Sequence, residues 1–266
     1  MDFNKNEFNI TLKDYKLKFY FKPALFLNNS EIENLKQDMF YVKNNCNPNI
    51  NYGIFSKKNN LDECLKNVLI SIFYLNEEPV GMFYNVIINI PSLQKTASHQ
   101  GLFILNKNSG IDILNSVGVI SSIILFEKIG EFYVTTLSST PSVLESIIEN
   151  TSDAWPCYYS NNQRPPVDYK EVFKITVNEY KDKFISENEI IDIDYKKFKI
   201  KISNSVSNYS LGIHNFPLAK KTEHNLFYNF WINYNLEELV FLICKYNLQN
   251  QIDNKNKLLK YFNVSF

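Results

Sequence analysis

The sequence predicts an α/β protein with a mixed central sheet, flanking helices and a C-terminal α/β extension. Two long apolar, β-favouring runs at 68–75 and 80–90 are separated by Asn-Glu-Glu-Pro at 76–79, which indicates a hairpin. Residues 101–150 then alternate strand-like and helix-like segments, the pattern of a crossover helix between parallel strands. Hydrophobic residues make up 45% of the 266 residues and charged residues 21%, which is enough apolar material for a core.

The N-terminal part predicts a strand followed by a capped helix. Residues 17–22 alternate apolar and cationic side chains, and Pro23 ends this run. Ser30 and Glu33 have the spacing of a capping box, so we expect a helix from Ser30 to about Val42. Residues 61–69 fit either a short helix or a helix that runs into a strand, and the sequence leaves both open.

The segments after the hairpin predict one strand-helix-strand-helix succession. In order, we expect a polar connection at 91–98, a strand at 101–105, a helix at 111–130, a strand at 131–138 and a helix at 142–150. Gly130 is a typical C-cap, and Pro141 suits the first turn of the last helix. The run at 101–105 is continuously apolar, so its strand should be buried on both faces.

The pattern loosens beyond residue 151. We expect a loop, a helix at 169–184, a strand at 195–203 and an amphipathic helix at 235–247. The sequence contains no internal repeat and no Gly/Ser linker here. The expected organisation is a core at 1–150 and a packed extension at 151–266, with a small second domain as the alternative.

Charge argues against a nucleic-acid partner. Lys plus Arg and Asp plus Glu both number 28, so the formal net charge is zero. Arg164 is the only arginine, and arginine is the residue of choice for bidentate phosphate recognition. A sequence-specific DNA reader is therefore not expected.

Neither cysteine nor histidine spacing predicts a metal site. No CxxC pair occurs among the four cysteines, which are Cys46, Cys64, Cys157 and Cys244. His214 and His224 lie ten residues apart with Glu223 beside the second, and no HExxH motif exists. We expect reduced thiols and no metal cofactor.

Hydropathy predicts a cytoplasmic protein without a membrane span. The N-terminal residues lack the apolar core of a signal peptide. The longest apolar candidate, Val117 to Phe126, is interrupted by Ser121 and Ser122 and is far shorter than a membrane span.

The loop at 106–112 predicts an anion site. The free amides of a helix's first turn point outward after a buried strand, and the helix dipole favours negative charge there. Lys107 and Ser109 add a cation and a hydroxyl, and Gly110 keeps the backbone accessible. The alternative is an ordinary strand-to-helix turn in which Gly110 serves only the backbone. The loop has neither the Walker A ending nor the GxGxxG fingerprint.

The capped helix, hairpin, buried strand, loop, helix, strand and helix over roughly 16–150 together resemble the GNAT family of acyl-coenzyme A N-acyltransferases. That family carries Gln/Arg-x-x-Gly-x-Gly/Ala after its fourth strand, and Lys107, Gly110 and Asp112 match those positions. The resemblance implies that the amides of 107–112 hold the coenzyme A pyrophosphate and that 101–105 pairs with the pantetheine arm. The cofactor-binding residues implied are Phe103, Ile104, Leu105, Lys107, Asn108, Ser109, Gly110, Ile111, Asp112 and Ser138.

Asp112 departs from the family pattern, which has a small residue there. A carboxylate a few ångströms from a diphosphate would disfavour binding by roughly a few kcal/mol. Alternatively, Asp112 stabilises the helix start and points away from the loop. The first case describes a relative that no longer binds the cofactor.

Three residues are candidates for proton transfer. His99 precedes the strand at 101 and has a suitable intrinsic pKa for a base, whereas an exposed loop histidine is the alternative. Tyr158 and Tyr159 follow the helix at 142–150 and could protonate the thiolate, although the chain contains 17 tyrosines. Tyr84 could line the acceptor side or the core, and Cys157 is better explained as buried and apolar than as a nucleophile.

The resulting prediction is an N-acyltransferase that moves an acetyl or other acyl group from acyl-coenzyme A to a primary amine within a ternary complex. The acceptor is a small molecule or a protein, and the sequence gives no oligomeric state. The alternatives are an inactive interaction module with the same fold and an acyltransferase that uses an acyl carrier protein as donor.

Overall fold

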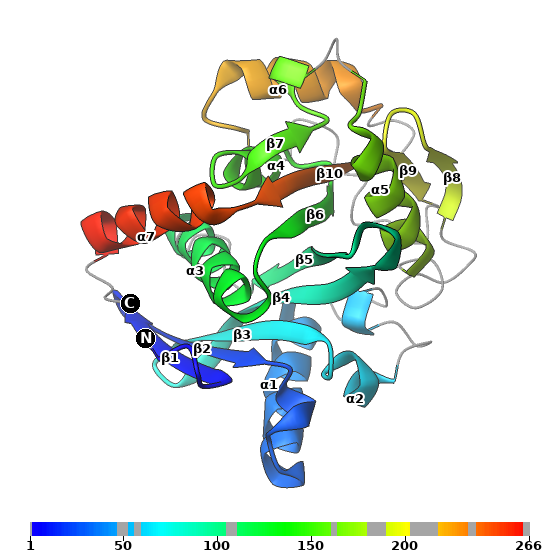
Figure 1. Ribbon diagram of the computed structural model, residues 1–266. Coiled ribbons are helices and arrows are strands. Elements are labelled where there is room, and N and C mark those ends of the chain that lie inside the picture. The colour runs from blue at the N-terminus through cyan, green and yellow to red at the C-terminus, as the bar shows by residue number, and fades with distance from the viewer. Residues whose placement is uncertain are drawn as a thin grey trace. The chain divides into compact units, whose positions relative to one another are not determined.

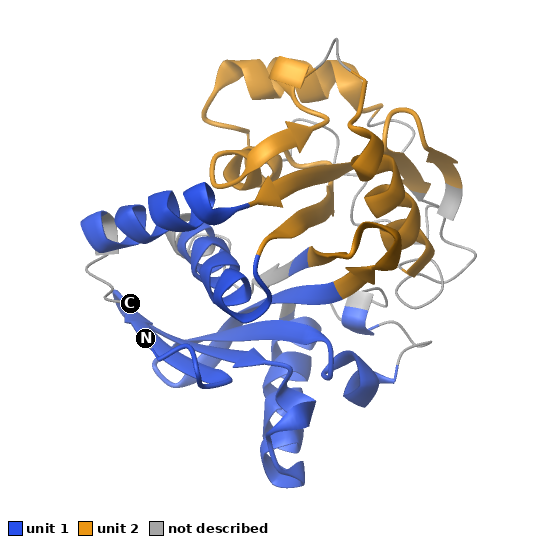
Figure 2. Ribbon diagram, in the orientation of Figure 1, with its two compact units in different colours: residues 1–87, 100–130, 247–266 blue, residues 88–99, 131–246 orange. Residues whose placement is uncertain are grey.

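A computed structural model (Figure 1) describes residues 2–46, 53–55, 60–104, 111–160, 164–179, 190–202, 218–233 and 238–262. The chain divides into two units, which Figure 2 shows in different colours. Unit 1 comprises 1–87, 100–130 and 247–266, and unit 2 comprises 88–99 and 131–246. Each unit is therefore assembled from segments that are distant in the sequence.

Unit 1 contains an antiparallel sheet that the hairpin signal anticipates. Its strands follow the order β1 (Glu7–Leu12), β2 (Tyr15–Phe21), β3 (Val68–Leu75) and β4 (Glu78–Ile90), with residues 88–90 of β4 in unit 2. Asn76 and Glu77 alone form the β3–β4 turn, with φ of 51° and 65°. Two left-handed residues are what a two-residue hairpin turn requires. The predicted four-residue connection at 76–79 is therefore too long, because Glu78 and Pro79 already belong to β4.

The helices of unit 1 are α1 (Asn29–Cys46), α2 (Leu61–Cys64), α3 (Ile111–Ile129) and α7 (Leu248–Phe262). The short helix of the 61–69 segment ends before β3 begins, so the helix-then-strand interpretation is confirmed. Gly130 ends α3 with φ of +73° and donates its N–H to the carbonyl of Phe126, which confirms the predicted C-cap.

The capping box of α1 differs from the predicted one. The side chain of Asn28 accepts a hydrogen bond from the N–H of Glu31 at 3.1 Å, and Glu31 accepts one from the N–H of Asn28 at 2.8 Å. The box predicted at Ser30 and Glu33 is wrong by two residues, and Glu33 pairs with Lys36 instead. The sequence contains overlapping Asn-x-x-Glu and Ser-x-x-Glu patterns, and either residue type caps a helix well.

Helix α7 packs against α3 through polar side chains. Gln251 is buried and donates to Glu127 at 2.9 Å and to the carbonyl of Ile123 at 3.4 Å. Lys255 pairs with Glu127 at 2.6 Å, and this pairing lowers the pKa of the Glu127 carboxyl. The sequence pattern predicts no element at 248–262, because the buried face of α7 is largely polar.

Unit 2 is built on a longer sheet. Its hydrogen-bonded order is the end of β4, β5 (Lys95–Ile104), β6 (Phe132–Ser138), β10 (Glu238–Tyr246), β9 (Lys199–Ile202) and β8 (Ile190–Asp194), while β7 (Ser152–Trp155) also pairs with β10. Residues 100–104 of β5 belong to unit 1. The helices of unit 2 are α4 (Pro141–Ile148), α5 (Val167–Glu179) and α6 (Thr222–Trp231). Pro141 is the first residue of α4, as predicted.

The predicted helix at 235–247 is wrong, because Glu238–Tyr246 forms strand β10. Seven of the nine residues of β10 are buried, and the strand pairs with β6 on one side and with β7 and β9 on the other. A short apolar run does not distinguish a buried helix from a buried strand by periodicity. Tertiary pairing decides the matter here, and residues 235–237 lie outside the described part of the chain.

Three further predicted boundaries need correction. The polar connection at 91–98 is wrong from Lys95 onward, because β5 begins there. The strand predicted at 195–203 is wrong at its start: residues 195–198 form the turn between β8 and β9, with Phe198 at φ of 52°, and the strand β9 spans Lys199–Ile202. Residue 203 lies outside the described residues. The helix predicted at 169–184 is α5, which begins at Val167, and residues 180–184 lie outside the described residues.

The predicted α/β class is confirmed. In unit 2 the core is strongly aromatic, with Phe173 stacked on Phe198 at 4.5 Å and Trp155 edge-on to Phe198 at the same distance. Within the part of the chain that the structure describes, no helix combines the length and apolar character needed to cross a bilayer.

Candidate active site

The predicted anion loop connects a strand to a long helix. Strand β5 ends at Ile104, and α3 begins at Ile111 and runs for 19 residues. Leu105, Lys107, Asn108, Ser109 and Gly110 lie outside the described residues. For Phe103, Ile104, Ile111 and Asp112 the structure describes the backbone element but not the side chain.

The side chain of Tyr84 lies over the backbone of β5 at Gly101, just before this segment. A Cβ added to Gly101 would lie 2.1 Å from Cζ and 2.3 Å from the hydroxyl oxygen of Tyr84. Tyr84 lies on the neighbouring strand β4 and is 2% exposed. No side chain fits at position 101 unless Tyr84 moves, so the glycine is required by packing.

His99 is a buried residue of β5 rather than an exposed loop histidine. Its side chain is 2% exposed and stacks on Phe241 with ring centroids 5.7 Å apart. Its Nδ1 lies 3.0 Å from the hydroxyl of Thr135 on β6. Burial lowers the pKa of the imidazole from 6.5 to about 3, so the ring is neutral at physiological pH.

The Thr135 hydroxyl links His99 to the neighbouring backbone. It lies 3.0 Å from Nδ1 of His99 and 3.4 Å from the carbonyl oxygen of Ser98. Which atom of the His99–Thr135 pair donates follows the tautomer of the ring.

Tyr158 and Tyr159 lie in a 3-10 helix at Tyr158–Ser160 and are about 39% and 51% exposed. Their rings meet edge-on at 5.2 Å, and Tyr158 also contacts the ring of His224 edge-on at 4.8 Å. Desolvation and the neighbouring Cys157 raise the pKa of Tyr159 far above its usual value. The phenol of Tyr159 is therefore neutral at physiological pH, and its deprotonation is disfavoured.

Cys157 is buried, as the sequence analysis expected. Its thiol donates to the carbonyl of Ala154 at 3.0 Å, and its sulfur lies 3.1 Å from the hydroxyl of Ser160. Burial raises the pKa of the Cys157 thiol, so the nucleophilic thiolate is disfavoured.

Ser138 ends strand β6 and makes a local turn. Its hydroxyl accepts a hydrogen bond from the N–H of Thr140 at 3.0 Å, immediately before α4 begins at Pro141. This is the helix-start role that serine and threonine commonly have at such a position. His99, Tyr158, Tyr159 and Ser138 all belong to unit 2, whereas the implied cofactor residues at 103–112 belong to unit 1.

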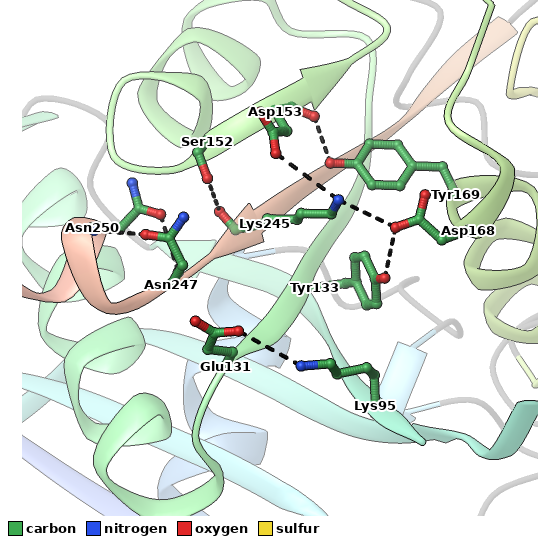
Figure 3. Close-up of polar contacts among 10 residues, drawn as sticks. All are labelled: Lys95, Glu131, Tyr133, Ser152, Asp153, Asp168, Tyr169, Lys245, Asn247 and Asn250. Carbon is green, nitrogen blue, oxygen red and sulfur yellow. Dashed lines mark hydrogen bonds and ion pairs between the residues drawn. The ribbon is translucent and has the colours of Figure 1, made fainter. Parts of the chain in front are cut away.

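Sequence reasoning missed a polar cluster in unit 2, which Figure 3 shows. The ammonium group of Lys245 lies 3.3 Å from a carboxylate oxygen of Asp168, 3.9 Å from one of Asp153 and 5.5 Å from the ring centre of Tyr169. The phenol of Tyr133 donates to Asp168 at 2.8 Å. These residues come from β6, β7, α5 and β10, which are distant in the sequence, so only the tertiary structure brings them together. The one signal in the sequence is a lysine within the apolar run of β10.

A buried carboxylate holds the start of α6. Glu145 on α4 is 3% exposed and accepts hydrogen bonds from the backbone N–H groups of Lys220 at 2.6 Å and Lys221 at 2.8 Å. The positive end of the α6 dipole favours this charge. His224, one turn further on, is buried with a lowered pKa, and its Nδ1 has no hydrogen-bond partner among the residues that the structure describes.

A metal ion has no ligand set in the described segments, which hold no group of three or more His, Cys, Asp or Glu side chains that could bind one. His214, which the sequence analysis weighed as a metal ligand, lies outside these segments.

Solved structures similar to this chain include those of two GNAT acetyltransferases, the family that the sequence resembles. RimL, a ribosomal L7/L12 alpha-N-protein acetyltransferase in complex with coenzyme A, is 12% identical with a TM-score of 0.29, and the similarity covers 48% of this chain and 74% of RimL. The Campylobacter jejuni N-acetyltransferase PseH is 18% identical with a TM-score of 0.27, covering 53% of this chain and 90% of PseH. No family model matches the sequence, and none of the curated proteins matches it.

Proposed function

We propose that this protein is an N-acyltransferase that transfers an acetyl or other acyl group from acyl-coenzyme A to a primary amine. The nitrogen of the amine attacks the thioester carbonyl, the carbon–sulfur bond breaks, and coenzyme A leaves as a thiol. Direct transfer requires donor and acceptor to be bound together. We assign donor binding to residues 1–150 and contacts with the acceptor to 151–266.

The connection between β5 and α3 is the observation that supports the proposal. A strand that ends at Ile104 leads through six residues into a 19-residue helix that begins at Ile111. The first amides of such a helix have no partner within it, and the helix dipole favours an anion in front of them. The proposed occupant is the diphosphate of coenzyme A, with Lys107 and Ser109 as additional donors. The backbone amides at 103–105 would stabilise the oxyanion of the tetrahedral intermediate.

Proton transfer is assigned to unit 2. Tyr159 is a candidate for the acid that protonates the leaving thiolate, because its phenol is neutral at physiological pH. Burial and Cys157 raise its pKa, which opposes this step, since donation leaves a disfavoured phenolate. Tyr158 is the second candidate for this acid. His99 is the candidate base, but its pKa of about 3 disfavours the imidazolium. The proposal therefore needs the amine's proton to pass through His99 to solvent rather than remain on the ring.

Asp112 decides between the enzyme and the inactive alternative. It is the second residue of α3, where a carboxylate stabilises the helix start and also lies close to the proposed diphosphate. If its charge blocks the anion site, the chain is an interaction module that does not bind the cofactor. Asp112→Asn removes the charge and keeps the shape of the side chain, so it distinguishes an acyltransferase from a module that does not bind the cofactor.

Calorimetric titration of the whole chain tests the proposal. We expect wild-type protein to bind free coenzyme A and acetyl-coenzyme A, and to bind pantetheine, which lacks the diphosphate, about tenfold or more weakly, a difference of about 1.4 kcal/mol. Lys107→Ala should weaken coenzyme A binding about threefold to tenfold through the loss of one charge-assisted contact. Lys66→Ala is the matched control, because Lys66 forms a surface pair with Glu63 at 2.6 Å in the same unit.

Two results would remove parts of the proposal. Binding by Asp112→Asn but not by wild-type protein supports the inactive module. No binding by either protein excludes the coenzyme A site. If wild-type protein binds an acylated acyl carrier protein but not acyl-coenzyme A, the donor is the carrier protein.

A further inference from the structure

Helix α7 carries a row of exposed aliphatic side chains, which we call the α7 stripe. It consists of Leu248, Ile252 and Leu259, which are 58%, 45% and 48% exposed. At 3.6 residues per turn the three positions fall within about 40° of one another around the helix and span about 17 Å along it. Large aliphatic side chains that line up on one exposed face are typical of a surface that a partner covers.

The buried face of the same helix is largely polar. Gln251 and Asn254 are 3% and 1% exposed, and they lie on the same side as the buried Leu258. Gln251 donates to Glu127 of α3, which also belongs to unit 1. The α7 stripe lies about 110° around the helix from this face. Attachment to α3 therefore leaves the stripe exposed, whereas a helix at the surface of a globular protein ordinarily buries its apolar face.

The spacing of the α7 stripe suits another helix. Positions 248, 252, 255 and 259 are separated by four, three and four residues, which is the spacing of the contact positions in a coiled coil. The narrow width of the stripe is that of a helix–helix seam, whereas a helix that lies in a membrane surface has a broad apolar face. The remaining position is Lys255, whose aliphatic stem suits the seam while its ammonium pairs with Glu127 at 2.6 Å.

The four-three-four spacing is the same in both directions along the helix, so the α7 stripe is complementary to itself. When two α7 helices lie antiparallel about a two-fold axis, Leu248 of one copy faces Leu259 of the other, and Ile252 faces the stem of Lys255. Charge repulsion between the copies is low, because the formal net charge of the chain is zero and Lys255 is paired with Glu127 within each copy.

We propose that the α7 stripe is the contact surface of a homodimer, in which two copies of this chain pair their α7 helices antiparallel. Two helices in contact over about 17 Å bury less than the roughly 1,200 Å² of a standard interface, so the dimer is weak and reversible. We expect a dissociation constant on the order of 0.1 mM. Helix α7 then has two partners, α3 within its own chain and α7 of the second copy.

Sedimentation equilibrium of the whole chain measures the association. The average mass should rise from 31.2 kDa toward twice that value as the protein concentration increases to about 1 mM. Ile252→Lys sets a second ammonium against Lys255 of the other copy and should raise the dissociation constant about tenfold or more. Ile252→Glu sets a carboxylate there and should stay within about threefold of wild-type protein. Lys257→Gln, on the side of α7 away from the stripe, is the control and should dimerise like wild-type protein.

Disulfide cross-linking tests the direction of the two helices. A mixture of the Leu248→Cys and Leu259→Cys variants should form the 248–259 disulfide between chains under mild oxidation, which mass spectrometry of the linked peptides detects. Each variant alone should form no disulfide between identical positions, because these lie about 17 Å apart in an antiparallel pair.

Thermal unfolding of each variant shows that it is folded, and little change is expected because the substituted side chains are about half exposed. Wild-type protein that stays monomeric at about 1 mM overturns the inference. Binding of such a monomer to phosphatidylglycerol vesicles would assign the stripe to a membrane instead. Equal dimerisation of Ile252→Lys and Lys257→Gln, or disulfides between identical positions, also overturns the antiparallel contact. None of these measurements involves coenzyme A, so the proposed function stands or fails separately.

Discussion

The imidazole of His99 and the hydroxyl of Thr135 lie 3.0 Å apart on neighbouring strands, and both side chains are buried. The hydroxyl also lies 3.4 Å from the carbonyl oxygen of Ser98, so the pair belongs to a short chain of polar groups between the two strands. The folded protein disfavours protonation of His99, because burial removes the ring from water and penalises its charged form.

His99 should make the protein sensitive to mild acid. Its pKa falls from 6.5 in the unfolded chain to about 3 in the folded protein. Between these values the unfolded state binds one more proton than the folded state, so stability decreases as the pH falls from about 6.5 to 3. At about 1.4 kcal/mol per pKa unit, the loss reaches roughly 5 kcal/mol once the pH lies below both values.

Urea unfolding of wild-type protein and His99→Gln at a series of pH values measures this effect. The difference in free energy of unfolding between the two proteins should shrink as the pH falls through the window, because Gln does not titrate. A difference that is constant from pH 7 to pH 3 would contradict a buried neutral His99.

Removal of the Glu145 charge should lower the free energy of unfolding more than removal of an exposed charge in unit 2. Its buried carboxylate accepts two backbone N–H groups at the start of α6. Glu145→Gln places an amide N–H against one of these donors, and we expect a loss of about 2 kcal/mol in the free energy of unfolding. Glu149→Gln is the control, because its exposed ion pair with Lys221 at 2.9 Å should contribute less than about 1 kcal/mol. Equal losses in the two variants would show that Glu145 does not hold α6.

The two buried thiols should resist alkylation in the folded protein. Burial raises the pKa of Cys157 and raises that of Cys244 to about 12, so neither forms the reactive thiolate at neutral pH. Cys64 is only half-buried and should react before these two. Mass-spectrometric mapping after iodoacetamide treatment, with and without denaturant, tests this order. Early labelling of Cys157 or Cys244 without denaturant would contradict it.

Asp168 should couple energetically to Tyr133. The phenol donates to the carboxylate at 2.8 Å, and burial together with this contact raises the pKa of Tyr133 well above its usual value. In a double-mutant cycle of Tyr133→Phe and Asp168→Asn, we expect a coupling of about 0.5–1.5 kcal/mol in the free energy of unfolding. Tyr195→Phe, at a half-exposed tyrosine, should show no coupling to Asp168→Asn. A coupling near zero for Tyr133 would mean that solvent replaces the hydrogen bond at no cost.

Local signals located most elements of residues 1–150 correctly. The hairpin, the helix that ends at Gly130 and the helix that starts at Pro141 follow from turn residues, caps and apolar runs, all of which act over a few neighbouring residues. The errors in this part are shifts. The capping box of α1 is formed by Asn28 rather than by the predicted Ser30. Strand β5 starts at Lys95, because pairing with its neighbours extends it into a polar stretch.

The errors beyond residue 151 are changes of element type. Residues 238–246 suit a helix by apolar spacing, yet they form a strand because β6, β7 and β9 supply hydrogen-bond partners on both edges. Pairing between strands also explains why His99 is buried. His99 lies within β5 and belongs to the core, whereas the sequence pattern placed it in the connection before the strand. The side chains of the implied cofactor loop lie outside the described residues, so that part of the site remains a prediction.

By itself, the sequence determined the α/β class, the hairpin and the succession of strand, loop and helix from 101 onward, because these depend on contacts between near neighbours. Only the tertiary structure decided which apolar runs became strands, which histidine is buried and neutral, and which distant residues, such as Lys245 and Asp168 or Tyr84 and Gly101, meet. These outcomes depend on hydrogen bonds and packing between segments far apart in the chain, and the energy of such contacts exceeds local preference.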